Sequence, residues 1–123
     1  MATSVEDPEL RALADVIVPD HPTFNDTSGM IQKMNVDLYA PFEETIYIDS
    51  DCLIFGDITP MFDQFQGLPV GLLGDYVTQG HYYTDVTSLL KKLGLEKLPR
   101  FCAGMIYLNK AAGASRVYDA VRA

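Results

Sequence analysis

The sequence has few cysteines, few basic residues and no long hydrophobic run, and each shortage excludes a class of protein. Two cysteines among 123 residues are too few for a disulfide framework. Nine basic residues stand against 17 acidic ones, and the net charge of −8 argues against binding nucleic acid or an anionic membrane surface. No apolar run approaches the roughly 20 residues of a membrane span, and the first residues lack the features of a signal peptide. We therefore expect a cytoplasmic protein.

What is present is typical of a folded domain. Hydrophobic residues make up 48% of the chain and charged residues 21%, which favours a globular protein over a disordered one. There are no internal repeats, low-complexity tracts or linkers, so we expect residues 1–123 to form a single domain.

The most informative stretch runs from Thr45 to Asp57. The β-branched and aromatic residues 45–48 predict a strand, and Asp49 and Asp51 follow it directly. On an extended chain these two carboxylates point to the same side, roughly 7 Å apart at their Cα atoms, and repel each other unless a cation compensates them. Carboxylates are ligands of hard cations such as Mg²⁺, which also bind phosphate oxygens. The stretch therefore predicts a metal–phosphate site at the edge of a sheet.

Periodicity and capping residues predict the other elements. Helices are expected over 7–14, 29–39, 60–65, 84–93 and 114–121, strands over 15–18, 68–74 and 105–108, and loops over 19–28 and 75–83. The helix over 29–39 depends on an apolar stripe formed by Met30, Ile31, Met34 and Leu38. A helix between two strands suggests a β-α-β unit, which pairs its strands in parallel. The expected fold class is α/β, a mostly parallel Rossmann-like sheet flanked by helices.

Polar residues follow several of the predicted strands. Ligands of parallel α/β sheets bind at the carboxyl ends of the strands. Asp49, Asp51, Asp75 and Asn109 each come after an apolar strand, so we expect them to converge. Cys52 and Cys102 are interpreted as small core residues, and a single bridge between them stays open.

Two segments carry a resemblance to a known family. Residues 47–54 (Tyr-Ile-Asp-Ser-Asp-Cys-Leu-Ile) and the following 56–62 (Gly-Asp-Ile-Thr-Pro-Met-Phe) resemble the Asp-x-Asp segment of nucleotide-sugar glycosyltransferases with the GT-A fold, most of all family 8. Residues 101–109 resemble the family's later Phe-Asn-Ala/Ser-Gly strand, with Cys102 in the place of the Asn. The helix with Lys33 and the turn over 38–42 resemble the family's lead-in. The resemblance implies the central part of a nucleotide-diphospho-sugar transferase domain, incomplete at the N-terminus.

The resemblance also implies an activity and a set of site residues. The chain would transfer a sugar from a nucleotide-diphosphate sugar, foremost a UDP-sugar, to a saccharide or protein acceptor. Asp49 and Asp51 would bind Mn²⁺ or Mg²⁺, which holds the diphosphate. The other donor-binding candidates are Lys33, Ser50, Asp75, Ala103, Gly104 and Asn109.

Other interpretations remain open. The chain could be a non-catalytic relative that acts as a binding or subunit module. A haloacid-dehalogenase-like phosphatase also carries Asp-x-Asp after an apolar strand, and Asp49 would then be the nucleophile. Asp49 and Asp51 could also be a solvated turn after a strand, an alternative that the matching residues around them disfavour. Because an incomplete sheet leaves an open edge, we also expect a homodimer.

Overall fold

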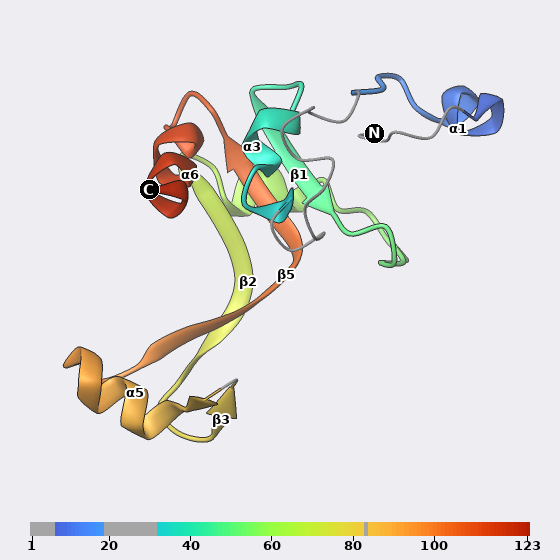
Figure 1. Ribbon diagram of the computed structural model, residues 1–123. Coiled ribbons are helices and arrows are strands. Elements are labelled where there is room, and N and C mark those ends of the chain that lie inside the picture. The colour runs from blue at the N-terminus through green and yellow to red at the C-terminus, as the bar shows by residue number, and fades with distance from the viewer. Residues whose placement is uncertain (1–6, 19–31, 83) are drawn as a thin grey trace.

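One antiparallel sheet forms the centre of the molecule. The computed structural model describes residues 7–18, 32–82 and 84–123. Its three-stranded sheet has the order β1-β5-β2, with β1 (Glu44–Ile48) and β2 (Val70–Val77) antiparallel to the central β5 (Leu98–Asn109) (Figure 1). Short helices accompany this sheet, so the protein is a small α+β protein. The expectation of a mostly parallel Rossmann-like sheet is wrong.

The β-α-β argument failed because β1 pairs with a later strand. Residues 15–18 were expected to be its neighbour but form no strand of this sheet. They follow α1 (Pro8–Leu13), which begins as predicted, with the Asp7 side chain accepting a hydrogen bond from the Glu9 amide at 2.7 Å. The register of β1 runs from Glu44 opposite Asn109 to Ile48 opposite Met105. Antiparallel strands need no crossover helix, so the intervening helix did not determine the strand direction.

The helix expected over 29–39 is interrupted. The predicted loop over 19–28 and the first residues of this helix lie outside the described residues. The described part is helical at 32–33 and again in α3 (Val36–Tyr39), with a turn between them. Leu38 of the predicted stripe is half exposed, whereas Val36 and Ala40 are buried. The interruption breaks the 3.6-residue period, so a different face of α3 points toward the core.

The remaining predicted helices are present. They are α4 (Pro60–Gln64), α5 (Val86–Leu93) and α6 (Ala114–Arg122). Asp85 caps α5 by accepting from the Ser88 amide at 2.8 Å, and Gly94 ends the helix in the left-handed conformation, with a φ of 67°. The expected loop over 75–83 is wrong in part, because β2 continues to Val77 and the short strands β3 (His81–Tyr82) and β4 (Thr84–Asp85) follow.

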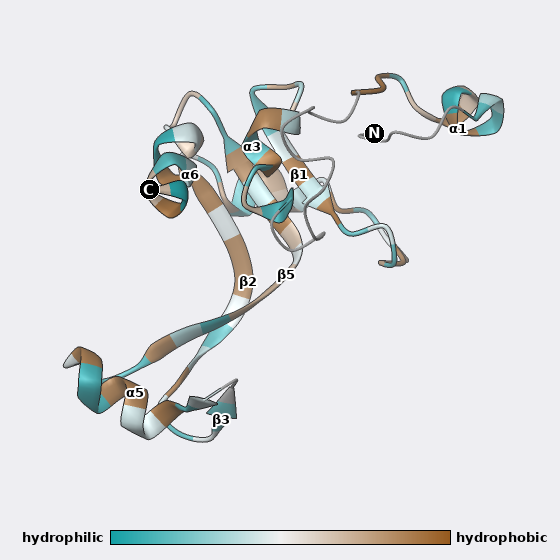
Figure 2. Ribbon diagram, viewed as in Figure 1, coloured by the Kyte–Doolittle hydropathy of each residue, from teal (hydrophilic) through white to brown (hydrophobic). Residues whose placement is uncertain are grey.

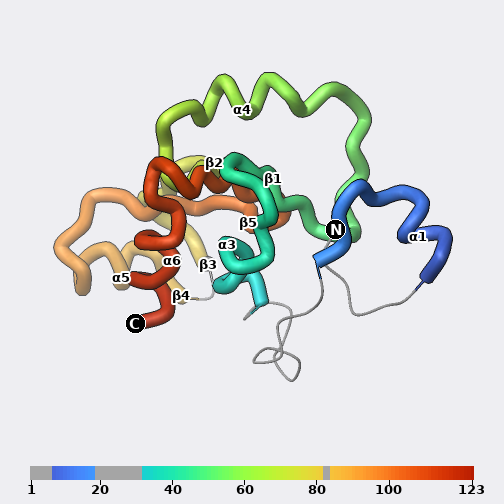
Figure 3. The backbone as a smooth tube through the Cα atoms, turned by 90° about the horizontal axis from the view of Figure 1, so that it is seen from above, coloured from blue at the N-terminus to red at the C-terminus, as the bar shows by residue number. Residues whose placement is uncertain are grey.

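Helices cover both faces of the sheet. On one face, α3 and α6 pack against Ile106 and Leu108, and Figure 3 shows α4 on the opposite side. Tyr107 points to the α4 face because side chains alternate along a strand. Its ring stacks on Phe65 with the ring centroids 5.5 Å apart. Figure 2 shows the hydrophobic residues along β1 and along the part of β2 that these helices cover.

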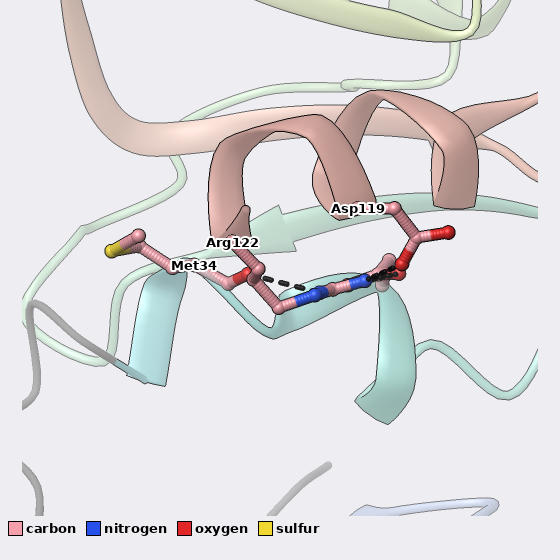
Figure 4. A network of polar contacts seen from close by, with 4 residues as sticks. Met34, Asp119 and Arg122 are labelled. Carbon is pink, nitrogen blue, oxygen red and sulfur yellow. Dashed lines mark hydrogen bonds and ion pairs between the residues drawn. The ribbon is translucent and has the colours of Figure 1, made fainter.

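An ion pair joins α6 to α3. The Arg122 guanidinium donates to both carboxylate oxygens of Asp37, at 2.7 and 3.2 Å. It also donates to Asp119 of its own helix and to the Met34 carbonyl oxygen (Figure 4). The Asp37 side chain is 0% exposed, so this carboxylate depends on Arg122 for its charge compensation.

A bulge divides β2 and β5 into two parts. The register moves from Leu72 opposite Ile106 to Leu73 opposite Cys102, which leaves residues 103–105 of β5 without partners in β2. Beyond the bulge the two strands leave the helices and continue as a two-stranded ribbon that carries α5 (Figure 1). Bulges bend strands and are frequent beside functional sites. This one lies beside the turn that contains Asp49.

Candidate functional site

The acidic pair lies on a tight turn. Strand β1 ends at Ile48, and the Cys52 amide donates to the Asp49 carbonyl oxygen at 3.0 Å, which closes a turn over residues 49–52. Ser50 and Asp51 are exposed on this turn, whereas Asp49 is half-buried. The turn replaces the extended backbone on which the expected side-by-side placement of Asp49 and Asp51 depended.

Two hydrogen bonds attach this turn to the bulge of β5. The Asp49 amide donates to the Gly104 carbonyl oxygen at 2.9 Å. The Cys52 thiol points to the same oxygen at 3.7 Å, although these residues are 52 positions apart in the sequence. The two segments on which the family resemblance rests therefore meet in the structure, at Asp49 and Gly104.

Both oxygens of the Asp49 carboxylate accept hydrogen bonds from side chains. The Lys33 ammonium lies 2.5 Å from Oδ2, and the Tyr47 hydroxyl donates to Oδ1 at 2.5 Å. The bond from Lys33, and then that from Tyr47, lowers the pKa of Asp49 below its usual value. Burial, followed by the bond to Asp49, raises the pKa of Tyr47. Asp49 is therefore ionised in the neutral range while Tyr47 keeps its proton.

Replacing Lys33 with glutamine is expected to raise the pKa of Asp49, because the largest influence that lowers it is removed. A carboxyl group whose pKa is lowered by folding adds stability above its unfolded pKa and loses that contribution as the pH falls through the folded value. The variant should therefore lose less stability than the wild type on acidification. NMR titration of the Asp49 carboxyl carbon measures the shift, and the exposed Lys91→Gln on α5 is the control. An unchanged Asp49 pKa in Lys33→Gln would contradict the ion pair.

Two of the predicted site residues lie elsewhere. Asn109 is buried at the other end of β1, where its amide donates to Glu44 at 2.8 Å and its side-chain oxygen accepts from the Ala112 amide at 2.9 Å. Asp75 lies within β2, not after it, opposite Arg100 on the ribbon. The expectation that both converge with Asp49 is wrong, because that expectation assumed parallel strands whose carboxyl ends share one edge.

The neighbouring site candidates Ala103 and Gly104 differ from each other in their surroundings. Ala103 is partly buried and packs against the hydrophobic core. Gly104 is buried, and it contributes its carbonyl oxygen to the turn. The described site therefore consists of Lys33, Tyr47, the turn over 49–52 and the Gly104 backbone.

No protein-family model, curated protein or solved structure matches the chain. The described residues contain no group of three or more His, Cys, Asp or Glu side chains that could hold a metal ion. None of the helices described is long and apolar enough to cross a membrane.

Two features of the site were missed in the sequence. Tyr47 was assigned only to the strand, although its position two residues before Asp49 places both side chains on one side of an extended segment. Cys52 and Cys102 were interpreted as core residues, but both are exposed and neither is bridged. The sequence shows no signal for the cysteines, because their environment depends on the turn and the bulge.

Proposed function

We propose that this chain contributes the donor-binding site of a metal-dependent nucleotide-sugar glycosyltransferase similar to family 8. The observation that carries the proposal is the hydrogen bond from the Asp49 amide to the Gly104 carbonyl oxygen. It brings together the two segments that resemble the family, and the Lys33 ammonium lies at the same carboxylate. A sequence resemblance alone does not require this convergence.

The acidic residues on the turn suit a cation that arrives with a diphosphate. Mg²⁺ and similar hard cations commonly take one or two carboxylates from the protein and further oxygens from substrate phosphates. Asp51 is exposed and offers its carboxylate. Each oxygen of Asp49 accepts one hydrogen bond and has a second lone pair. Asp51 and Asp49 would therefore hold Mn²⁺ or Mg²⁺, and the bound cation would offset the charge that develops on the leaving nucleotide diphosphate.

Lys33 and Tyr47 would prepare the site through the Asp49 carboxylate. Their hydrogen bonds fix the orientation of the Asp49 carboxylate and keep it ionised, which cation binding requires. An ammonium group has three N–H donors, and Asp49 takes one of those on Lys33. The others can donate to a phosphate oxygen. Lys33 thus neutralises part of the negative charge that the two aspartates and a diphosphate would bring together.

The alternative of a phosphatase with Asp49 as nucleophile gains no support from these contacts. A carboxylate that accepts hydrogen bonds on both oxygens is a weaker nucleophile, since each donor stabilises its negative charge. Release of phosphate from an aryl phosphate, lost in Asp49→Ala, would instead identify the hydrolase. The homodimer and the acceptor stay predictions from the sequence.

Calorimetric titration of UDP, with GDP in parallel, tests the proposed donor site. We expect binding only when Mn²⁺ is present. Asp51→Ala should weaken this UDP binding by at least about 10- to 100-fold. Removal of a residue that only supports a metal ligand already costs that much. Asp63→Ala is the matched control, since Asp63 is an exposed aspartate on α4 and the substitution changes the net charge equally.

Three results would contradict the proposal. Binding that needs no metal would remove the role of the cation. Binding that survives Asp51→Ala unchanged would remove the role of the turn. An equal loss in Asp63→Ala would show that only the overall charge matters.

A further inference from the structure

The two cysteines lie close to Gly104. Cys52 is on the acidic turn and Cys102 is on β5, where the bulge begins. The Cys102 sulfur is 3.4 Å and the Cys52 sulfur 3.5 Å from the position that a β-carbon would take at Gly104, so the two sulfur atoms are at most about 7 Å apart. Both cysteines are free and exposed.

Gly104 has no side chain at the point where the two sulfur atoms approach it. The three atoms nearest to the β-carbon position at Gly104 are the two sulfur atoms and Oδ2 of Asp49, the last at 3.6 Å. A methyl group placed there would contact both sulfur atoms.

The backbone brings the two thiols together and leaves Cys52 room to turn. The Asp49–Gly104 hydrogen bond and the closed turn place Cys52 against β5, and its thiol points to the Gly104 carbonyl oxygen. Residues 52–55 have no regular secondary structure, so no ladder of backbone hydrogen bonds restrains this segment. An S–S bond is about 2.05 Å long, so closure requires rotation of the two side chains together with movement of this segment toward β5.

We propose that Cys52 and Cys102 form a reversible disulfide beside Gly104 by exchange with a low-molecular-weight disulfide such as glutathione disulfide. One cysteine thiolate attacks a glutathione sulfur, forms a mixed disulfide and releases one glutathione thiol. The second cysteine thiolate then attacks the protein sulfur of the mixed disulfide and releases the second glutathione thiol. The two protein thiols are oxidised, glutathione disulfide is reduced to two glutathione molecules, and the two thiol protons pass to water or to the departing thiolates.

The bond would change the surroundings of Asp49. The disulfide sulfur atoms would occupy the space beside Oδ2 of Asp49 and would tie the turn that carries Asp51 to β5. This device is independent of the identity of any ligand, so it can be tested on the purified chain alone.

The test is the equilibrium between the protein and a glutathione redox buffer, measured as the effective concentration of the two thiols. Quenched samples are analysed by mass spectrometry, in which the intramolecular disulfide lacks two hydrogen atoms and carries no glutathione. We expect the effective concentration to be at least about tenfold higher in the folded protein than in concentrated urea, because folding holds together two thiols that are far apart along the unfolded chain. Cys52→Ser and Cys102→Ser should form only mixed disulfides with glutathione.

Glycine-to-alanine substitutions test the geometry. Gly104→Ala places a methyl group in contact with both sulfur atoms, which restricts their movement, and is expected to lower the effective concentration about tenfold in the folded protein. Gly56→Ala is the matched control, because a β-carbon there would have no atom within 4 Å. Circular dichroism checks that each variant is folded. An effective concentration no higher in the folded protein than in urea, or disulfides only between molecules, would overturn the proposal. The same value in a folded Gly104→Ala would overturn closure beside this glycine.

Discussion

Arg122→Met is expected to lower the free energy of unfolding by about 3 kcal/mol or more, as removal of one partner from a buried ion pair commonly does. The Asp37 side chain is 0% exposed and receives two hydrogen bonds from the guanidinium. Without Arg122 this carboxylate would stay buried without its cation. Because Arg122 also binds the Met34 carbonyl oxygen, the substitution removes the polar link between α6 and α3.

Urea denaturation measures this loss of stability. Two further variants test whether it comes from the buried ion pair. Arg116→Met removes an exposed arginine from the same helix and should change the stability by no more than about 0.5 kcal/mol. Adding Asp37→Leu to Arg122→Met should recover most of the lost stability, since apolar residues often replace a buried ion pair at little cost. A loss in Arg122→Met no larger than that in Arg116→Met would show that the pair contributes little.

Tyr107→Ala is expected to cost about 3–5 kcal/mol, the range for removing a large aromatic side chain from a core. Tyr107 is 0% exposed and lies near the end of β5, the central strand of the sheet. Its ring stacks on Phe65 and meets Phe62 edge to face, with ring centroids 6.1 Å apart. These contacts hold α4 against the sheet, so the cavity would lie between these two layers.

Tyr107→Phe separates the ring from its hydroxyl group. This variant keeps the aromatic contacts and loses only the hydrogen bond from Asn109 to the hydroxyl oxygen, so we expect a cost of about 1 kcal/mol. Thermal and urea unfolding of both variants give the comparison. If Tyr107→Ala cost no more than Tyr107→Phe, the ring would not be the main contact between α4 and the sheet.

Elements with strong local signals could be predicted from the sequence. The strand over 45–48 has a β-branched and aromatic run, and α5 has both a capping aspartate and a terminal glycine. These signals act over a few residues, and they do not depend on the rest of the fold. They therefore gave the positions of most elements, even where the tertiary arrangement differs from the expectation.

Strand pairing could not be predicted in the same way. The partner of β1 is β5, and their direction depends on long-range contacts that no local pattern records. The prediction of which face of α3 is buried was wrong for a related reason. Asp37 is buried because its carboxylate pairs with an arginine 85 residues away in the sequence. A polar residue in a helix predicts exposure unless its distant partner is known.

The candidate site could also be predicted only where local motifs, and not long-range contacts, determine it. Asp49 and the Gly104 strand were recognised by their local motifs, and the structure joins them by a backbone hydrogen bond. Lys33 was named only as a donor-binding candidate, and the structure adds its ion pair with Asp49. The roles of Tyr47 and of the two cysteines depend on side chains that meet only after the turn and the bulge have formed.

The bulge in β5 also separates a part of the molecule that should unfold locally from a part that should stay folded. Within the body, β5 has strand neighbours on both sides, whereas in the ribbon β2 is its only described partner. A two-stranded ribbon by itself is only marginally stable in water, and here it carries only small elements: a short helix with Val86 and Leu90 as its buried residues, and the two-residue strands β3 and β4. Amide protons of the ribbon should therefore exchange with solvent through local openings that leave the body intact. One continuous strand thus belongs to two units of unequal stability, and the proposed site lies at their boundary.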